Sequence, residues 1–380
     1  MLHYPHPTFR PGDFLPTFVA DTPVNPRFEF DAVAGRTVLL CFVGSGTKGK
    51  AAAAVHAVRA IEKSLHAAGI LVYLVTGHPE ERQGTALMSD DKRTMPFFDL
   101  DLKIHNAYGM VDRSSSSGRD YTVLRNGCFL VGRNLRLTDY IDFAPLDTFA
   151  QRVGAAVAKL PAPLPAAPVG GHAPVLYVPE VFERELCRQL IDEYEEHGGG
   201  PSGVMRDVNG VTTGFLDNSV KRRRDAPIRN PDTLARVRRN LVRRLTGEIK
   251  KVYNFDATHI ERFMVGCYDS GDSGFFSAHR DNGGSGTAHR RFAVSINLNA
   301  EEFEGGELWF PEYGPHLYKP ATGGAVVFSC SMLHEARKVT AGRRYAFLPF
   351  LFDAKAAAIR DANRGLLSKD APIVVESTAA

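Results

Sequence analysis

Phe276-Ser277-Ala278-His279-Arg280-Asp281 places an imidazole and a carboxylate two positions apart. On a strand, residues at that spacing face the same side, so the pair taken alone is more typical of a surface ion pair than of a metal site. His334 and then Arg344 follow further along the chain and change that expectation. Two imidazoles and one carboxylate can hold a divalent iron on one face and leave the opposite face free for a co-substrate and O₂. We therefore predict a metal site formed by His279, Asp281 and His334.

Several further motifs stand around this segment in a fixed order. They are Tyr268-Asp269-Ser270-Gly271 before it, and Ser295 to Asn299, Gly305 to Phe310, Pro320 to Gly323 and Gly342-Arg343-Arg344 after it. In this order they resemble the prolyl 4-hydroxylase-like branch of the Fe(II)/2-oxoglutarate dioxygenases, and the resemblance covers roughly residues 173 to 353. It implies a double-stranded β-helix (jelly roll) flanked by helices. The short β-rich runs after Ile260, separated by Gly, Pro and Asp, agree with that architecture.

The resemblance also implies a reaction and a set of roles. His279, Asp281 and His334 would bind Fe(II) as the catalytic centre, and O₂ and 2-oxoglutarate would be consumed to hydroxylate a peptidyl, amino-acid or small-molecule substrate, releasing succinate and CO₂. Ascorbate would restore iron that has become oxidised. Related halogenating enzymes have a small residue where this chain keeps Asp281, so hydroxylation is favoured over halogenation. Nothing in the sequence specifies the primary substrate.

Arg344 would bind the distal carboxylate of 2-oxoglutarate, because a guanidinium can form a bidentate pair with it. Arg343 is the alternative, but successive residues of a strand point to opposite faces, and the spacing to His334 favours Arg344. Tyr268 would hydrogen-bond to the same carboxylate or line the pocket, and the alternative is a half-buried core tyrosine. His289 and His316 have no such partners and are expected to be structural or solvated.

Positive charge is concentrated ahead of the predicted barrel. Lys221 to Arg224 are four consecutive cations, and Arg236, Arg239 and Arg243 share one face of a predicted helix over 232–251. The simpler interpretation is a solvated face, and the functional one is guidance of an anionic substrate toward the iron. Nucleic acid is not an expected partner, because no aromatic residues are interleaved for base stacking.

The N-terminal half has a different pattern, and a Pro/Ala/Gly linker over 160–173 separates it from the rest. Apolar runs at 36–43, 70–76 and 127–132, with a helical pattern at 50–69 and a glycine at its end, predict an α/β fold. We expect domains at 1–159 and 174–353, and a tail over 354–380 with a helix and a loose end.

Three N-terminal motifs carry a second resemblance. Pro11 to Phe18, Gly35 to Phe42, and Asp101 with Ala107-Tyr108-Gly109 resemble the peroxiredoxin branch of the thioredoxin-like fold over residues 8 to 150. Thr47 of the active-site motif remains, but Lys50 stands where these enzymes have the peroxidatic cysteine, and an ammonium cannot attack a peroxide as a thiolate does. The resemblance therefore implies a peroxiredoxin-like domain without peroxidase activity. Such a domain would position a substrate, dock a partner or mediate homo-oligomerisation, while weak anion binding by Lys48 and Lys50 stays open.

Composition limits the remaining possibilities. The chain has 44% hydrophobic and 23% charged residues, and no apolar run approaches the ~20 residues of a membrane span. A membrane role is therefore not expected. Residues 1–13 have neither the basic start nor the apolar core of a signal peptide, which predicts a cytoplasmic protein. Five scattered cysteines predict free, buried thiols. The alternative function is a non-catalytic metal-binding or sensing protein, against which Arg344 counts, since a structural metal needs no carboxylate anchor.

Overall fold

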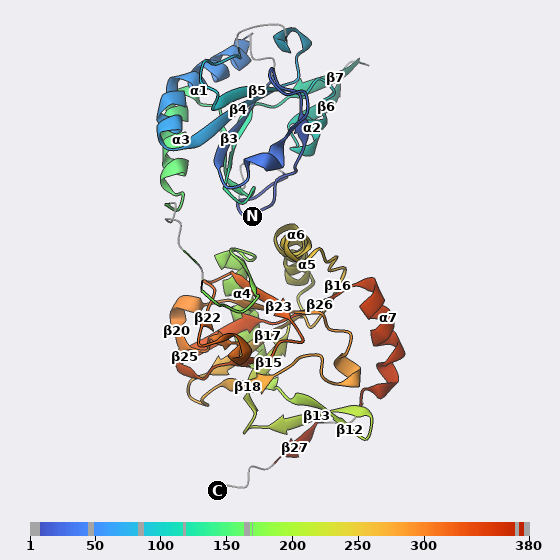
Figure 1. The fold of residues 1–380 in the computed structure, drawn as a ribbon. Coiled ribbons are helices and arrows are strands. Elements are labelled where there is room, and N and C mark those ends of the chain that lie inside the picture. Colours follow the sequence, from blue (N-terminus) through green and yellow to red (C-terminus); the bar gives the residue numbers. More distant parts are fainter. Residues whose placement is uncertain are drawn as a thin grey trace. The chain divides into compact units, whose positions relative to one another are not determined.

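The chain folds into two units, which divide between Pro165 and Ala166 in a computed structural model (Figure 1). The structure describes residues 8–44, 49–82, 87–116, 119–162, 168, 170–368 and 372–375. Among these residues, no helix has the length and apolarity needed to cross a membrane. Within the same ranges, all five cysteines are free and buried, as their scatter predicted.

A five-stranded sheet with the order β5-β4-β3-β8-β9 forms the centre of the N-terminal unit. Its strands are β3 (Thr37–Gly44), β4 (Ile70–Thr76), β5 (Thr94–Phe98), β8 (Gly127–Val131) and β9 (Leu137–Asp142). The first three are parallel to one another, and β8 and β9 are antiparallel to their neighbours. Short two-stranded sheets pair β1 (Val19–Ala20) with β2 (Phe28–Glu29), and β6 (Val111–Ser116) with β7 (Arg119–Leu124). The predicted strands at 36–43, 70–76 and 127–132 are confirmed to within one residue at each end.

Both faces of this sheet are buried, which explains why its strands read as continuous apolar runs. Helices α1 (Gly49–Ala67) and α3 (Phe149–Ala158) cover one face, where Cys41 of β3 and Cys128 of β8 are buried. Phe42 points to the other face and packs near Tyr108, which follows helix α2 (Lys103–Ala107). The glycine-rich segment 45–48 and the side chain of Lys50 lie outside the described part of the structure.

Two antiparallel sheets form the centre of the C-terminal unit. The larger has the order β10-β23-β19-β25-β17-β15-β11, with β16, β20 and β26 attached. Its strands are β10 (Leu176–Val178), β11 (Gly200–Pro201), β15 (Arg224–Pro227), β16 (His259–Glu261), β17 (Met264–Asp269), β19 (Phe292–Asn297), β20 (Phe303–Gly305), β23 (Ala325–Ser329), β25 (Val339–Phe347) and β26 (Phe350–Phe352). The smaller has the order β14-β18-β24-β21-β22, formed by β14 (Lys221–Arg222), β18 (Phe275–His279), β21 (Leu308–Trp309), β22 (Leu317–Tyr318) and β24 (His334–Ala336).

The space between these two sheets is a shared apolar core. Tyr268 and Val326 reach it from the larger sheet, and Leu308 and Ala336 reach it from the smaller one. Ala173, the last residue of the predicted linker, is fully buried in the same core, and its N–H donates to the Tyr318 hydroxyl at 2.7 Å. That end of the linker is therefore part of the packed C-terminal unit.

Helices cover the outer face of the larger sheet (Figure 1). Helix α4 (Arg184–His197) buries Leu186, Leu190 and Tyr194 there and ends at Gly198, whose φ of 75° is the left-handed conformation that glycine tolerates. Helix α5 (Pro231–Leu241) begins where the Asn230 side chain accepts two backbone N–H groups, and a π-helical turn (Val242–Thr246) joins it to α6 (Gly247–Tyr253). The predicted helix over 232–251 is confirmed, with that π-helical interruption.

The C-terminal tail differs from expectation at one point. Helix α7 (Ala354–Ala362) is present as predicted, but β27 (Ile373–Val375) then pairs in parallel with β13 (Val211–Asp217), next to β12 (Val204–Val208). The expected loose end is therefore wrong for residues 373–375. The apolar stretch Ile373-Val374-Val375 supplies a strand whose backbone hydrogen bonds are satisfied by β13.

Candidate metal centre

Two facing strands of the smaller sheet bring the predicted metal ligands together. His279 ends β18 and His334 begins β24, and the antiparallel register pairs them directly, with ring centroids 4.2 Å apart. Asp281 follows β18, and its two carboxylate oxygens each lie 3.4 Å from one Nε2, of His279 and of His334. The candidate ligand atoms all lie within 4.8 Å of one another. A single ion could therefore contact all three side chains.

The second nitrogen of each imidazole already has a partner. His279 Nδ1 donates to the Ser277 carbonyl at 2.8 Å, and His334 Nδ1 donates to the Met332 carbonyl at 3.1 Å. A proton on Nδ1 leaves the Nε2 lone pair free, and backbone acceptors of this kind orient metal-binding histidines. Phe276 stacks on the His279 ring at 3.5 Å and restricts it further. Both rings are thus held with Nε2 toward the carboxylate.

The charge state of the triad suits a divalent cation. Burial lowers the pKa of His334 to about 4, so this imidazole is neutral at physiological pH. Burial alone would raise the pKa of Asp281, but the imidazoles of His334 and His279 outweigh it and hold that pKa below the usual range of a carboxyl. One carboxylate and two imidazole nitrogens on one side form the donor set typical of non-haem iron sites. The side chains therefore fit Fe(II) by chemistry and by proximity.

Arg344 lies deeper between the sheets, in a small cavity of about 60 Å³ that it shares with the triad. Its side chain is 2% exposed. The guanidinium donates to Ser295 Oγ at 2.8 Å and to Asn297 Oδ1 at 3.2 Å, and it lies over the Tyr268 ring. Among the described residues it makes no ion pair with any carboxylate. Burial accordingly lowers its pKa, which expresses the cost of holding this cation without a counter-ion.

Arg343 and Tyr268 are the other two residues considered for contact with the co-substrate, and the structure shows where they lie. Arg343 points outward, is half exposed and pairs with Asp269 at 2.7 Å, so strand alternation separates it from the cavity as the sequence reasoning expected. Tyr268 is buried beside Arg344, and its hydroxyl accepts from Arg223 at 3.3 Å. It therefore lines the pocket, while also belonging to the core between the sheets.

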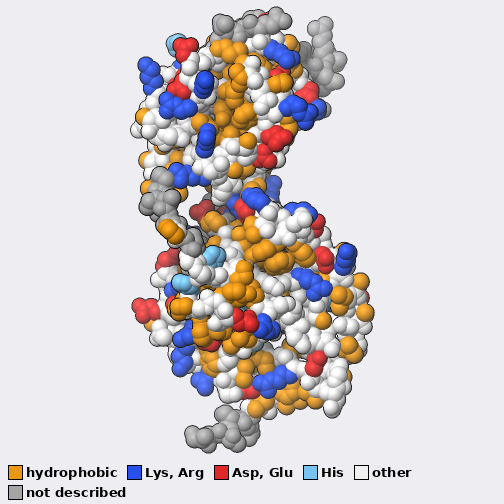
Figure 2. Space-filling view, in the orientation of Figure 1, with side chains coloured by type: hydrophobic (Ala, Val, Ile, Leu, Met, Phe, Trp, Pro, Cys, Tyr) orange, Lys and Arg blue, Asp and Glu red, His pale blue; other side chains and the backbone are white. Residues whose placement is uncertain are grey.

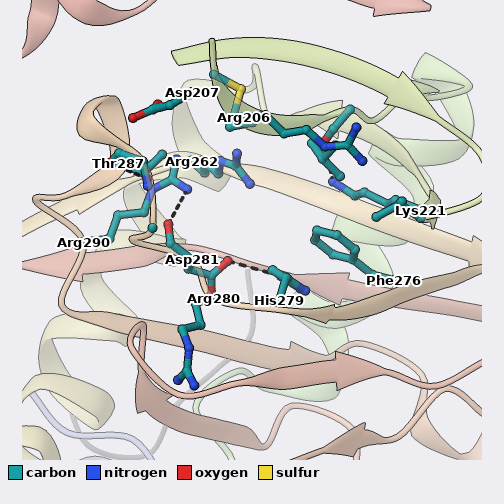
Figure 3. Close-up of a pocket in the computed structure, with 16 residues that line it drawn as sticks. Arg206, Asp207, Lys221, Arg262, Phe276, His279, Arg280, Asp281, Thr287 and Arg290 are labelled. Atoms are coloured by element: carbon teal, nitrogen blue, oxygen red, sulfur yellow. Dashed lines mark hydrogen bonds and ion pairs between the residues drawn. The ribbon is translucent and has the colours of Figure 1, made fainter. Parts of the chain in front are cut away.

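A second, larger cavity of about 390 Å³ opens above the triad and is the one drawn in Figure 3. Lys221 from β14 lines it and is 4% exposed, with Nζ donating to Ser202 Oγ and to the Gly203 carbonyl. Arg223 is 8% exposed, lines the inner cavity and pairs with Asp225 at 2.6 Å. Solvation of the whole Lys221 to Arg224 run is thus wrong for these two residues. The alternating signal was available, since positions 221 and 223 share a face of a strand.

The basic helix is placed differently from its functional interpretation. Arg236 of α5 donates to Gln189 and pairs with Glu185 of α4, and Arg244 is buried with Glu183 at 3.2 Å. Neither lines the cavities at the triad. Guidance of an anion by this helix is therefore not supported, and Arg236 instead contacts helix α4. On the face shown in Figure 2, Lys and Arg are interspersed with acidic and apolar side chains instead of forming one patch.

His289 and Arg262 complete the surroundings of the site. His289 is buried and hydrogen-bonds to Glu261 at 2.8 Å, which confirms a structural histidine, whereas His316 is exposed. Arg262 lines both cavities and has a φ of 66°, unusual for any residue other than glycine. Arg262 was not predicted from the sequence, because no motif marks it.

Known proteins with similar sequences point in one direction. A PKHD-type hydroxylase of Paracoccus denitrificans is 37% identical over 147 residues, which are 36% of this chain and 62% of that protein. The chain resembles PKHD-type hydroxylases. Two more, from Nitrosomonas europaea and Acinetobacter baumannii, are 28% and 29% identical and match over 65% and 74% of their own lengths. The match spans less than two thirds of the first of these relatives, and no protein-family model matches the chain.

Solved structures of both expected kinds also match. A Xanthomonas campestris peroxiredoxin Q covers 39% of this chain and 97% of its own, at 13% identity and a TM-score of 0.34. A Trichoplax adhaerens prolyl hydroxylase bound to a hypoxia-inducible-factor peptide covers 49% and 86%, at 19% identity and a TM-score of 0.39. A viral collagen prolyl hydroxylase from Paramecium bursaria Chlorella virus-1 covers 47% and 94%, at 14% and 0.35. The hydroxylase resemblance expected from the motifs is found among the proteins with similar sequences.

Proposed function

We propose that this protein is an Fe(II)- and 2-oxoglutarate-dependent dioxygenase that hydroxylates a peptidyl, amino-acid or small-molecule substrate, with release of succinate and CO₂. We also propose that its two facing C-terminal sheets are the two halves of a jelly roll, and that the N-terminal unit is a peroxiredoxin-like domain without peroxidase activity. The hydroxylases with similar sequence support the first proposal. The antiparallel order of the two sheets around one core supports the second.

One observation carries the functional proposal: the buried guanidinium of Arg344, which has no ion pair within the described part of the chain, lies in the same cavity as the metal triad. An uncompensated buried charge costs several kcal/mol, so a protein retains one mainly where a ligand of opposite charge binds. A structural metal alone would not explain why Arg344 is buried without an ion pair among the described residues. A co-substrate with one carboxylate for Arg344 and a second group for the metal satisfies both features.

The roles of the chain's own residues follow from their geometry. His279, Asp281 and His334 would hold the iron, and the backbone carbonyls of Ser277 and Met332 fix the two rings in the orientation that this requires. Arg344 would bind the distal carboxylate of 2-oxoglutarate, positioned by Ser295 and Asn297. When bound, iron with 2-oxoglutarate supplies the activation of O₂ that inserts oxygen into a C–H bond. The apolar lining, including Phe328 and Leu308, would keep water from that reaction.

The test measures succinate formed by purified protein with Fe(II), 2-oxoglutarate, O₂ and ascorbate, with and without candidate substrates. Wild-type protein should release succinate even without substrate, by slow uncoupled turnover, and His279→Ala should reduce this to background. His316→Ala is the control, since His316 is exposed and lies outside the triad. Activity surviving in His279→Ala would refute the assignment. Tight iron binding with no succinate under any condition would instead favour a metal-binding sensor.

The N-terminal unit is proposed to position a substrate, dock a partner or join copies of the chain. Size-exclusion chromatography with light scattering on the full chain and on residues 170–380 tests the last possibility. A dimer that becomes a monomer on truncation would support self-association through this unit. An unchanged oligomeric state would exclude it.

A further inference from the structure

Arg262 differs from the other guanidinium groups that line the outer cavity. Arg206, Arg280 and Arg290 each form an ion pair, with Asp217 at 2.9 Å, Glu312 at 2.7 Å and Glu261 at 2.6 Å. Arg262 forms none among the residues that the structure describes, and its recorded contact is with the Phe350 ring, 5.0 Å from the guanidinium carbon. Within the described part of the chain, Arg262 is therefore the guanidinium of this cavity that has no ion pair, and Lys221 is a second cation of the lining without one.

The position of Arg262 relative to the metal ligands is defined by the two cavities. Four residues line both of them: Arg262, Phe276, His279 and Asp281. Figure 3 draws Arg262 among the side chains around His279 and Asp281. A ligand group held by Arg262 would thus lie where the two cavities meet, next to His279 and Asp281.

The backbone at Arg262 supports a role in ligand binding. Its φ of 66° is sparsely populated by residues with a Cβ, and such conformations persist where the surroundings impose them, often at ligand clamps. The pKa of Arg262 is lowered to about 10 by burial and by the nearby Arg290 and Arg223. The chain therefore retains a costly conformation and an unfavourable charge at one position beside the proposed metal site.

The proposed co-substrate does not account for this charge. One carboxylate of 2-oxoglutarate would pair with Arg344 and the other would reach the metal. Asp281 would neutralise part of the metal charge, and Asp207, the other carboxylate lining the cavity, is exposed and accepts hydrogen bonds from Thr212 and Ser285. Lys221 lines the same cavity, where its Nζ could donate a further hydrogen bond to an anion. Room and positive charge thus coincide in the outer cavity.

We propose that Arg262 is a specificity-determining residue that binds a carboxylate or phosphate group of the primary substrate, so that this enzyme acts on anionic substrates. The proposal rests on the proposed function, because it takes 2-oxoglutarate to occupy Arg344 and the metal. The guanidinium pairs with the anion in the outer cavity and holds the rest of the substrate against the open face of the triad. Neutral analogues of the same size lack that pair and bind weakly.

The test measures binding of inorganic phosphate and, separately, acetate to the full-length protein by isothermal titration calorimetry, with Mn(II) and saturating 2-oxoglutarate present. Arg262→Gln should weaken binding of the preferred anion about tenfold or more, the loss expected for a charged hydrogen-bonded pair. Arg262→Lys should retain most of the affinity because it keeps the charge. Arg239→Gln removes an equal charge from the exposed side of α5 and should leave the affinity within about twofold. The stronger of the two anions identifies the group.

Three results would overturn the proposal. They are no anion binding by the wild-type protein, equal affinity in wild type and Arg262→Gln, and anion binding that is seen without 2-oxoglutarate and lost when 2-oxoglutarate is added. The last would assign Arg262 to the co-substrate. Far-UV circular dichroism of each variant shows whether it is folded. Mn(II) binding by electron paramagnetic resonance and succinate release are measured on the same wild-type preparation. Anion binding through Arg262 without succinate would leave this site standing while the proposed function fails, and the converse result would separate them the other way.

Discussion

Arg343 and Arg344 are adjacent in sequence and lie in opposite environments. Arg343 is 54% exposed and pairs with Asp269, whereas Arg344 is buried beside Ser295 without a carboxylate partner among the described residues. The difference follows from the pleat of β25, which sends successive side chains to opposite faces. The pair offers a charge-matched comparison at one residue of separation.

We predict that Arg344→Gln raises the KM for 2-oxoglutarate about 10- to 100-fold, while Arg343→Gln leaves it within about twofold. Loss of a charge-assisted bidentate pair costs roughly 1.5–3 kcal/mol, whereas an exposed ion pair contributes little. The measurement is the 2-oxoglutarate dependence of succinate release. A larger effect at Arg343 would assign the co-substrate to the outer surface and contradict the inward role of Arg344.

His289 predicts a pH dependence of stability. Burial lowers the pKa of His289 below the usual 6.5 of a histidine, although Glu261 opposes the shift, and Nδ1 is buried with no acceptor for a second proton among the described residues. As pH falls through 6.5, His289 binds a proton in the unfolded chain but stays neutral in the native protein. The free energy of unfolding therefore decreases. His289→Gln should flatten the dependence between pH 8 and about 5.5 in urea unfolding. An equally steep dependence in the variant would assign it to other groups.

At the scale of single elements, a tight turn controls the position of Arg344. Gly306, after β20, has a φ of 67°, and a Cβ there would lie 2.9 Å from Val339 Cγ2 and 3.0 Å from Arg344 Cδ. Gly210, in the turn between β12 and β13, has a φ of 79° with open space around it. Both positions disfavour alanine by backbone conformation, but only the first couples it to the cavity.

We predict that Gly306→Ala and Gly210→Ala each lose on the order of 1–2 kcal/mol of stability, from the left-handed backbone. Gly306→Ala should in addition raise the KM for 2-oxoglutarate several-fold, because Arg344 must move. Urea unfolding and succinate kinetics measure the two effects separately. If Gly210→Ala raised that KM as much, general destabilisation and not displacement of Arg344 would be the cause.

The alternation of side chains along a strand also explains which cations were wrongly predicted to be solvated. In Lys221 to Arg224, positions 221 and 223 turn inward to the cavities, and 222 and 224 donate to backbone carbonyls as exposed side chains. In α5, by contrast, Arg236 pairs with Glu185 of α4 while Arg239 is exposed, so only part of the basic face is an interface between helices. A run of charges does not reveal its neighbours, and only packing distinguishes a solvated face from a buried one.

At the scale of the whole molecule, every residue of the proposed reaction belongs to one unit. The triad, Arg344, Tyr268 and Arg262 all lie between 166 and 380, and that unit has its own cores. We predict that residues 170–380 bind Mn(II) within about twofold of the full chain, as measured by electron paramagnetic resonance. The full chain should unfold in two transitions and the fragment in one, since each unit is expected to unfold cooperatively as a whole. Loss of Mn(II) binding by a folded fragment would show that the N-terminal unit completes the site.

Local patterns were enough for much of this protein. Apolar runs located the central strands of the N-terminal unit, and the spacing of His279, Asp281, His334 and Arg344 identified a candidate site, because strand and helix periods act between near neighbours. The tertiary structure alone decided the rest. It paired His279 with His334 across two strands, buried Lys221 and Arg223, joined 373–375 to a sheet, and placed unmarked Arg262 between the two cavities. Those outcomes depend on register and on which residues distant in sequence share a cavity, and no local pattern encodes either.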